Sequence, residues 1–522
     1  MAAKDDPFVP VLIPNQNGGL NTRNNSTLVE DNQFIDGLNL VVDEPGTVGT
    51  RPGTEKIADE VSSSQTCKGW LDYTKVNGNT YLVWKCAGSL YYIQPNSTTN
   101  TSIASGLSST DVEMGVFNDK IFISNATDDL RIWDGTTVTT NAGVPKGAHM
   151  IIFESRMYIT GNPANPSQVY FSDVPAYGSD PVTFGGGSVI NVSPGDNYKC
   201  TGFSISEGRL LISKGDQVNK KASSVYQVTY NTSGVPTGAQ RVEAQKGWLN
   251  AKTTSQYETS SIYLSDDSVR SIGQSAQYPA GYRDSDLSIN INRTIADVKS
   301  TANTLAAGLY NKSSYYLSVP YYQDAYNDVV LVYAYGAWTF WNNIYANRFI
   351  FWNGYVYFAD SRSGQLWRIN PEKKNDDTTA IRAYLITKHY ALGSPSVRKQ
   401  ISGIQARLYA DSNSRIRVSY SKDQGNYTKN TTWTVGLNQS GGAARTTPGI
   451  IGSYYGALDA AYGGTSTPSA DQEFSTRRWS FKEKAFLFSV KFEMEQLNKG
   501  FKLINFDIIS RQMPYNDYFD VN

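Results

Sequence analysis

Residues able to perform acid–base or nucleophilic catalysis at neutral pH are scarce in this chain. Its 522 residues contain two histidines, His149 and His389. A Ser-His-Asp hydrolase would have to use one of them, yet no Gly-x-Ser-x-Gly elbow precedes a helical pattern. The segment Gly185–Ser188 lacks the lysine and the following helix of a phosphate-binding loop, so it is predicted to be a turn. We therefore expect no enzyme and no cofactor.

The three cysteines, Cys67, Cys86 and Cys200, do not indicate a metal site. They are widely spaced, odd in number and without C-x-x-C spacing, so neither a zinc site nor a disulfide framework follows. The simplest interpretation is three small, buried, apolar side chains in a reducing compartment. Cys67 and Cys86 could be neighbours on adjacent strands.

Glycoside hydrolysis would need a pair of carboxylates, often with an arginine cluster, and no such pattern stands out. The segment Ser421–Thr428 (SKDQGNYT) resembles the Asp-box turn of sialidases. That box is a structural turn, and here it occurs once, outside the repeats described below. We predict a hairpin turn in which the Asp423 side chain caps backbone amides. A carbohydrate-cleaving enzyme is kept as a third hypothesis, which a screen on sialosides and arabinosides would test.

Basic residues gather in the last third of the chain. From Arg368 to Arg417 there are ten Lys or Arg against four Asp or Glu, and Arg477-Arg478 form a second group. Such residues could line a channel that passes DNA, where phosphate contacts carry no sequence information. They could equally form a solvated or subunit-facing surface. The candidates for DNA-channel or subunit contact are Lys373, Lys374, Arg398, Lys399, Arg415, Arg417, Arg477 and Arg478.

Overall charge and hydrophobicity favour a protein that associates. Lys plus Arg equals Asp plus Glu at 47 each, so there is no global attraction to nucleic acid or membrane. The first seven residues carry early acids and no apolar segment, unlike a secretion signal. No run of 18 apolar residues occurs, so we expect no membrane-spanning segment. Aromatic residues are abundant at 12%, mostly tyrosine, which favours strands.

One phrase recurs between about residues 61 and 371: an apolar residue, a two-residue polar turn and a short aromatic strand. Clear copies are Phe117–Ile123, Phe153–Ile159 and Phe351–Phe358, while the copy at Tyr263–Val269 is weak. Self-similarity at a period of about 40 to 50 residues is typical of a β-propeller. The sequence therefore predicts an all-β protein with a six- or seven-bladed propeller over 61–371. Only Asp286–Leu309 has a helical character.

Two further parts flank the propeller. Residues 1–60 are rich in Pro and Gly and are predicted to be an extended arm that lies along the main body or a neighbouring subunit. Residues 378–522 are predicted to form an antiparallel, β-sandwich-like domain. A Gly/Thr/Tyr-rich insertion at about 426–476 interrupts that domain and contains Tyr454, Tyr455 and Tyr462. The apolar residues proposed for assembly through the arm are Phe8, Leu12, Leu20, Phe34 and Leu38.

Three phrases of the arm resemble the opening of tailed-bacteriophage structural proteins. They are Gly18–Arg23 (GGLNTR), Asp31–Asn39 (DNQFIDGLN) and Gly49–Gly53 (GTRPG), the last forming a turn that enters a β-propeller. The stretches Thr387–Tyr390 and Val397–Ile401 resemble the exit from such propellers. The chain is similar in kind to the tail nozzle proteins of short-tailed phages and to the head-completion or stabilisation proteins that plug the portal.

This resemblance implies a virion structural protein of the neck or tail, made in the host cytoplasm. It implies a homo-oligomeric ring, commonly a hexamer, with propellers outside and a DNA channel inside that retains or releases the packaged genome. The implied partners are tail adaptor or portal proteins, tail fibre or spike proteins, and passing double-stranded DNA. The alternative is a receptor- or glycan-binding propeller at the tail tip, with exposed Tyr and Trp of the insertion as contacts.

Overall fold

The computed structural model describes residues 7–43, 46–217, 219, 221–244, 246–275, 278–435 and 472–513. The expected all-β fold is confirmed, with helix limited to short turns. Compactness divides the chain into two units. The repeat unit comprises 55–331 and 342–369, and the two-sheet unit comprises 1–54, 332–341 and 370–522.

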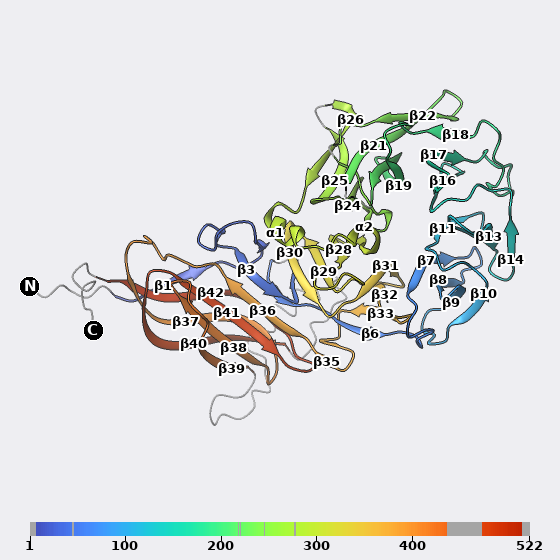
Figure 1. Cartoon of the computed structure of the whole chain (residues 1–522). Helices are drawn as coiled ribbons and strands as arrows, with labels where there is room; N and C mark the ends of the chain where they lie inside the picture. The colour runs from blue at the N-terminus through green and yellow to red at the C-terminus, as the bar shows by residue number, and fades with distance from the viewer. Residues whose placement is uncertain are drawn as a thin grey trace, which may run out of the picture. The chain divides into compact units, whose positions relative to one another are not determined.

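Small antiparallel sheets of four strands follow one another along the repeat region (Figure 1). The first three are β7 (Cys67–Thr74) to β10 (Thr101–Ala104) with β8 (Thr80–Cys86) and β9 (Ser89–Ile93); β11 (Glu113–Phe117), β12 (Lys120–Ser124), β13 (Leu130–Trp133) and β14 (Val138–Asn141); and β15 (His149–Phe153), β16 (Arg156–Asn162), β17 (Asn165–Phe171) and β18 (Val189–Asn191). The next three are β19 (Lys199–Ser206), β20 (Arg209–Asp216), β21 (Lys221–Tyr230) and β22 (Pro236–Arg241); β23 (Ser255–Tyr257), β24 (Ser260–Leu264), β25 (Val269–Ser275) and β26 (Tyr278–Asp286); and β27 (Ala307–Asn311), β28 (Ser314–Val319), β29 (Val329–Ala334) and β30 (Ala337–Asn342).

The last sheet of the series takes a strand from the other end of the sequence. It contains β31 (Ala346–Trp352), β32 (Tyr355–Asp360) and β33 (Leu366–Asn370), and β6 (Gly53–Lys56) lies next to β33. The Ile57 amide donates to the Leu366 carbonyl at 3.2 Å, and Glu55 forms an ion pair with Arg368. β6 comes before the first four-stranded sheet in the sequence but pairs with the last sheet of the series. This pairing closes the series of blades, as in a β-propeller.

The recurring sequence phrase corresponds to the first hairpin of a sheet. Phe117 lies opposite Lys120, so Asn118 and Asp119 form a two-residue loop, and both have positive φ, at 48° and 55°. Two residues with positive φ make the type of turn whose twist matches that of the flanking strands. Asn and Asp adopt this conformation at low cost, which explains the polar pair in the phrase.

The weak copy of the phrase lies one hairpin out of step with the others. Tyr263–Val269 spans the turn between β24 and β25, where Leu264 lies opposite Val269. The first hairpin of this sheet joins Tyr257 to Ser260 through Glu258, whose φ is 53°. The sheet itself has four strands like its neighbours. The sequence signal was weak because the strand that follows the turn at Asp266-Asp267, β25 (Val269–Ser275), contains no aromatic residue.

The first strands of successive sheets are neighbours in space. In order, β7, β11, β15, β19, β23, β27 and β31 each contact the next, and β31 contacts β7. Apolar side chains fill the space between sheets, as where Trp84 of β8 packs in one buried cluster with Tyr357 and Leu366. The core of the repeat unit therefore lies between its sheets, around an axis lined by the first strands.

Cys67 and Cys86 are directly opposite each other on β7 and β8, as the sequence suggested. Both thiols are free and buried, and burial raises their pKa values, that of Cys86 to about 12. Thiols held protonated in this way are poor nucleophiles. Cys200 is also buried and free, and burial raises its thiol pKa to about 11.

The segment with helical character forms only short turns. These are η2 (Ile289–Ile291), α1 (Asn292–Ala296) and α2 (Ala302–Leu305), with η1 (Ala251–Thr253) earlier in the chain. Asn292–Ala296 is too short to be stable alone, so its buried Thr294 and Ile295 must hold it in place.

The two-sheet unit contains strands from both ends of the chain (Figure 1). One sheet has the order β4-β5-β42-β37-β40, with β1 also on β42, and the other has the order β2-β3-β36-β41-β38-β39. The bounds in the first are β1 (Val9–Ile13), β4 (Leu40–Val42), β5 (Val48–Thr50), β37 (Lys399–Asp411), β40 (Gln472–Ala485) and β42 (Phe501–Gln512). Those in the second are β2 (Gly19–Leu20), β3 (Gln33–Leu38), β36 (Arg382–Thr387), β38 (Arg415–Lys422), β39 (Lys429–Thr434) and β41 (Phe488–Glu495). The short strands β34 (Asn375–Asp376) and β35 (Thr379–Ala380) pair with each other.

Aromatic contacts join the two sheets. Phe492 of β41 meets Phe506 of β42 with ring centroids 5.5 Å apart, and Tyr420 of β38 meets Trp479 of β40 at 5.2 Å. Such pairs contribute burial and a preferred ring geometry. The segment predicted as an Asp-box turn lies between β38 and β39, where Asp423 accepts from the amides of Phe486 and Leu487. The predicted capping role of Asp423 is confirmed.

The residues expected to form an arm are strands of these sheets. β1 pairs with β42 in antiparallel register, and β3 pairs with β36. Leu20 and Phe34 are buried in the core and Leu38 is half-buried, whereas Phe8 and Leu12 are exposed. The structure thus assigns 1–54 and 370–522 to one unit, where the sequence suggested an arm and a separate domain. Most of the insertion, including Tyr454, Tyr455 and Tyr462, lies outside the described residues.

Candidate functional site

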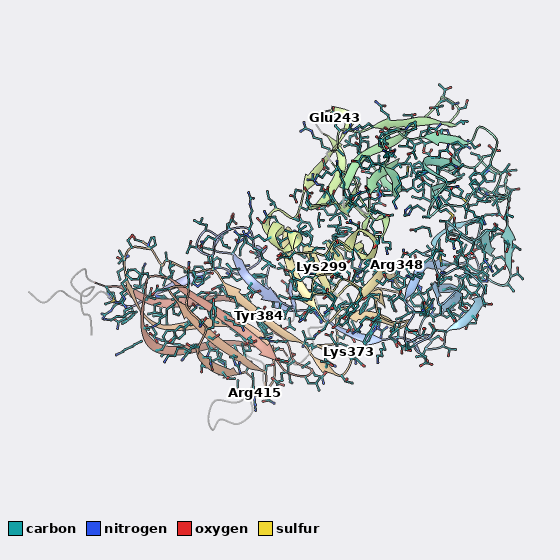
Figure 2. All side chains as sticks on the ribbon, in the orientation of Figure 1. Glu243, Lys299, Arg348, Lys373, Tyr384 and Arg415 are labelled. Carbon is teal, nitrogen blue, oxygen red and sulfur yellow. The ribbon has the colours of Figure 1, made fainter. Side chains whose placement is uncertain are left out.

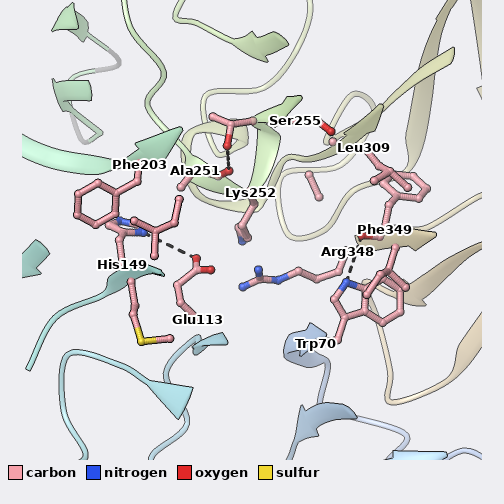
Figure 3. Close-up of a pocket in the computed structure, with 16 residues that line it drawn as sticks. Trp70, Glu113, His149, Phe203, Ala251, Lys252, Ser255, Leu309, Arg348 and Phe349 are labelled. Atoms are coloured by element: carbon pink, nitrogen blue, oxygen red, sulfur yellow. Dashed lines mark hydrogen bonds and ion pairs between the residues drawn. The ribbon is translucent and has the colours of Figure 1, made fainter. Parts of the chain in front are cut away.

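A cavity of about 320 Å³ lies on the axis of the repeat unit (Figure 3). Every first strand or the turn before it contributes to its wall, because those strands face one another around the axis. Aromatic rings of Trp70, Phe203 and Phe349 line it together with Met150. Two cationic side chains, Lys252 and Arg348, also line it. A wall that combines aromatic rings with charged and polar groups can hold a small molecule that has both an apolar and a charged part.

Lys252 is held by a rigid turn. It lies in η1, whose preceding residue Asn250 accepts a hydrogen bond from the Lys252 amide at 3.1 Å. The Asn250 side chain also donates to the carbonyl of Ala306 at 2.8 Å. The buried Tyr315 hydroxyl donates to the Thr253 carbonyl at 2.6 Å. These hydrogen bonds fix the backbone of η1. The Cα atom of Lys252 therefore has a defined position at the cavity wall.

Arg348 is positioned by an irregularity in β31. The pairing of β31 with β32 shifts register between Ala346 and Arg348, and such bulges re-aim a side chain. The Asn347 side chain donates to the Cys67 carbonyl, and the Trp70 indole donates to the Phe349 carbonyl at 3.2 Å. These two bonds join β31 to β7 on either side of Arg348. In Figure 3 the Arg348 guanidinium and the Lys252 ammonium point toward the same part of the cavity.

Both cations share a single carboxylate, Asp111. Its Oδ2 is 3.3 Å from Lys252 Nζ and 3.3 Å from an Arg348 nitrogen, while its Oδ1 is 3.7 Å from Lys68 Nζ. Burial tends to raise the pKa of Asp111, but the charges of Lys252, Arg348 and Lys68 outweigh it and lower the pKa to about 2. Three positive charges therefore face one carboxylate, which stays ionised.

A fourth cationic side chain, the third lysine, lies close to this cluster. Lys85 of β8 is fully buried, and its ammonium donates to the Thr110 carbonyl at 2.7 Å. Burial lowers its pKa from the ordinary value, and the charges of Asp111 and Asp128 oppose that shift. Burial likewise lowers the pKa of Lys252. The surroundings of Asp111 are therefore positively charged.

The same unit shows what a fully bonded buried lysine looks like. Lys214 has four acceptors at 2.7 to 3.1 Å: Ser167 Oγ, the carbonyls of Val192 and Ser193, and Asp196 Oδ1. Lys252 has one partner, Asp111, at 3.3 Å among the described contacts, and Arg348 Nε has no hydrogen-bond partner there. Both side chains are nine-tenths buried, at 10% and 11% exposure. Hydrogen-bonding capacity thus remains at the cavity.

The wall of the cavity also holds Glu113 and His149. Glu113 begins β11 and His149 begins β15, and their Oε1 and Nδ1 atoms are 3.8 Å apart (Figure 3). No hydrogen-bond partner of His149 Nδ1 is found in the described part of the chain. Charged groups of both signs are therefore available to a molecule in the cavity.

The basic residues singled out from the sequence all lie in the two-sheet unit and do not form one cluster. Arg415 and Arg417 are exposed on one face of β38, two residues apart, while Arg477 and Arg478 lie on β40 in the other sheet. Figure 2 labels Lys373 and Arg415. Lys373, like Arg478, is exposed.

Other members of that set are already engaged. Lys374 forms an ion pair with Asp411. Lys399 is 1% exposed, its ammonium donates to the Ser394 carbonyl, and burial lowers its pKa. Arg398 stacks over the Phe486 ring at 6.0 Å. Surface contacts with DNA are thus open to the arginines of β38 and β40 and to Lys373, more than to these three.

The second and third arm phrases, Asp31–Asn39 and Gly49–Gly53, meet in a buried polar network of the two-sheet unit. Arg51 is 1% exposed and makes a two-point contact with Asp376, at 2.9 and 2.6 Å. Its Nε donates to Asn39 Oδ1 at 2.9 Å, and Asn39 in turn donates to the Arg382 carbonyl at 2.8 Å. The Thr54 hydroxyl donates to Asp376 at 3.0 Å. This Arg51 network joins the second and third phrases to the residues that follow the propeller.

The first phrase and the exit stretch are each bonded to the second phrase. Gly19 has φ +76°, and a Cβ there would lie 2.8 Å from the backbone of Trp338, so glycine is required. Asn21 donates to Gln33 Oε1 at 2.7 Å. Lys388 of the exit phrase forms an ion pair with Asp31 at 2.8 Å, and the His389 amide donates to the Ser26 carbonyl at 3.0 Å. The phrases are structural joints between the two ends of the chain.

The sequence did not reveal the two cations of the cavity or the carboxylate that they share. Lys252, Arg348 and Asp111 are far apart in the chain and belong to no motif. The one available signal was their position next to the first strand of a repeat, since Asp111 precedes β11, Lys252 precedes β23 and Arg348 lies in β31.

Comparison with solved structures gives matches at low identity and low TM-score. No family model matches the chain, and no curated protein matches it. Among solved structures, YCF48 from Cyanidioschyzon merolae is 8% identical with a TM-score of 0.38, over 61% of this chain and 99% of that one. The computationally designed Ika8 protein is 7% identical with a TM-score of 0.37, over 60% and 100%. Kluyveromyces lactis Hsv2 is 9% identical with a TM-score of 0.32, over 51% and 82%.

The described ranges contain neither a cluster of possible metal ligands nor a helix that could cross a membrane. No group of three or more His, Cys, Asp or Glu side chains in them is placed to hold a metal ion. No helix in them is long and apolar enough to cross a membrane.

Proposed function

We propose that this chain is a structural protein of a bacteriophage virion, in the neck or tail, that assembles into a ring around a DNA channel. In this proposal the repeat unit is a seven-bladed propeller and the two-sheet unit is a β-sandwich. The ring, commonly a hexamer in the class that the chain resembles, docks to portal or tail adaptor proteins and to fibre or spike proteins. Its action is mechanical: it retains the packaged genome and lets it pass.

The observation that carries the proposal is the convergence of the phage-like phrases. Five short stretches, spread from Gly18 to Ile401, resemble one class of protein, and the first four of them meet in bonded contacts within one unit. Residues that act together as a joint are expected to recur together. Their joint occurrence supports a single structural origin more strongly than any one phrase.

The exposed arginines of the two-sheet unit support the channel. Arg415, Arg417 and Arg478 are exposed, and exposed guanidinium groups contact phosphates without reading sequence. The seven-bladed interpretation rests on the closed series of first strands, from β7 round to β31. The sandwich interpretation rests on the aromatic contacts between the two sheets.

The test has two parts. Mass photometry and negative-stain electron microscopy of the purified chain, with and without its adaptor, should show a discrete ring. Mass spectrometry of purified virions should detect the chain at a ring-like copy number. A chain that stays monomeric under all these conditions and is absent from virions would refute the proposal.

The channel is tested by the salt dependence of binding to double-stranded DNA. Replacing Arg415, Arg417 and Arg478 by Gln should reduce the slope of log affinity against log salt by about one for each phosphate that an arginine no longer neutralises. The matched control replaces three exposed lysines of the repeat unit, Lys146, Lys221 and Lys312, and should leave the slope unchanged. Equal slopes for both triple variants would argue against the placement of the channel.

A further inference from the structure

We propose that the axial cavity of the repeat unit binds a small organic oxyanion, a carboxylate or phosphate ester on an apolar body, between Lys252 and Arg348. This proposal concerns one unit of a single chain, so it is independent of the ring and of DNA. It assigns a ligand class to a cavity that the mechanical function does not use.

The first argument is incomplete bonding. Lys252 has three donor hydrogens and Arg348 has five, and buried donors of this kind normally have partners. Their shared partner is one Asp111 oxygen at 3.3 Å, and Arg348 Nε has none in the described part of the chain. A second oxyanion placed between them would supply the missing acceptors. Lys214, with four acceptors, shows that this fold satisfies a buried lysine where nothing else is to bind.

The second argument is charge. Lys68, Lys252 and Arg348 surround Asp111, and Lys85 lies beside it. The excess positive charge is held partly away from water, where its attraction for an anion is stronger than at an exposed surface. Guanidinium groups match planar carboxylates and phosphates at two points, and ammonium groups add a point charge.

The third argument is shape. The cavity of about 320 Å³ falls at the lower end of the range for ligand sites, roughly 300 to 1,000 Å³. Trp70, Phe203 and Phe349 offer ring surfaces for an apolar body. Glu113 and His149 also lie on the wall (Figure 3), and the Glu113 carboxylate offsets one of the positive charges around the cavity. An inorganic ion alone would leave the aromatic wall without a partner.

The experiment uses the methionines as reporters. The full chain has six, among which Met150 lines the cavity and Met494 is buried in the two-sheet unit. With ¹³C-labelled methionine methyl groups, benzoate and phenyl phosphate are titrated, with benzamide and benzylammonium as neutral and cationic probes of similar size. We expect one or both anions to shift the Met150 signal and not that of Met494. Benzamide should bind at least about tenfold more weakly, because a charge-assisted bond is worth about 1.5–3 kcal/mol.

Comparison of the two anions separates the two ligand chemistries, since the tighter one marks a carboxylate or a phosphate ester. The variants Arg348→Gln and Lys252→Gln should each weaken that anion at least about tenfold. The control Lys146→Gln changes an exposed lysine of the same unit and should bind as the parent chain does. The remaining methionine signals report whether each variant is folded.

Three outcomes would overturn the proposal. One is a Met150 signal that neither anion moves at concentrations up to about 10 mM, which corresponds to less than about 3 kcal/mol of binding. Another is equal binding of benzoate and benzamide, which would mean an apolar cavity without anion selectivity. The third is a folded Arg348→Gln or Lys252→Gln chain that binds like the control. The comparison of probes on the parent chain decides the matter even where a variant does not fold.

Discussion

Two buried arginines of this protein, Arg51 and Arg348, are bonded in opposite ways. Arg51, in the two-sheet unit, meets Asp376 at two points and donates further to Asn39 and to the Pro52 carbonyl. Arg348, in the repeat unit, shares one Asp111 oxygen with Lys252 at 3.3 Å. A buried charge is tolerated when its hydrogen bonds are complete. Arg51, with its complete hydrogen bonds, stabilises the fold. Arg348 still has hydrogen-bond donors available for a ligand in the cavity.

Sequence context agrees with this contrast. The residues of the Arg51 joint belong to short sequence phrases, or lie near them, just before and just after the repeats in the chain. The cavity is lined by single residues from separate repeats, which come together only when the sheets of one chain close around their axis.

Arg51→Met should be the most damaging change. It leaves Asp376, whose side chain is 11% exposed, without its cation, and breaking a buried pair costs about 3–5 kcal/mol. Urea unfolding followed by the methyl signal of Met494 should move to much lower urea, while the Met150 signal of the repeat unit moves less. The double variant Arg51→Met, Asp376→Leu should recover most of the loss, because apolar side chains can replace a buried pair. A single variant as stable as the parent chain would contradict the view of Arg51 as a joint.

Lys214→Met tests a satisfied lysine in the repeat unit. It removes a donor that serves four acceptors and leaves Asp196 without its ion pair. We expect a loss of about 2–3 kcal/mol, since several acceptors lose their donor together. Urea unfolding followed by the Met150 signal measures it. A loss below about 0.5 kcal/mol would show that the number of hydrogen bonds a buried lysine makes is a poor guide to its contribution to stability in this unit.

Asp111→Asn should cost about 1 kcal/mol at neutral pH, less than the changes above because its side chain is 43% exposed and water screens it. The pKa of Asp111 is lowered from its ordinary value of 3.8 to about 2. Its charge therefore contributes stability that is present above about pH 3.8 and is lost as the pH falls toward 2. The difference in unfolding free energy between the two chains should be constant from about pH 5 to 7 and shrink below about pH 4. The same variant should bind the preferred anion more tightly, because a competing carboxylate is gone.

Lys252→Met should change stability least, by no more than about 0.5 kcal/mol. Burial of the Lys252 ammonium costs free energy, and a single shared partner, Asp111, offsets only part of that cost. Methionine fills a similar volume without a charge. Asp111 keeps Arg348 and Lys68. Set beside Lys214→Met in the same urea assay, this variant gives the sharpest form of the comparison. A loss as large as that of Lys214→Met would make Lys252 a structural lysine.

The repeats made the all-β fold and its small sheets predictable, because a two-residue turn and an alternating strand are local signals. The repeat was hardest to recognise in the sheet of β23 to β26, because β25 contains no aromatic residue. The arm could not be placed from sequence, since its proline and glycine content resembles that of a free segment. Two of its strands, β1 and β3, pair with β42 and β36, more than 300 residues away.

The sequence by itself determined the strand-forming repeats, the polar turns that join them and the absence of a recognisable catalytic motif. The tertiary structure alone decided that Asn39, Arg51 and Asp376 form one joint. It alone also brought Lys252 and Arg348 to one cavity, where they share the Asp111 carboxylate. The physical reason is range. A turn depends on the φ angles of two adjacent residues, whereas the charge balance of a buried site depends on groups that meet only when the series of sheets closes.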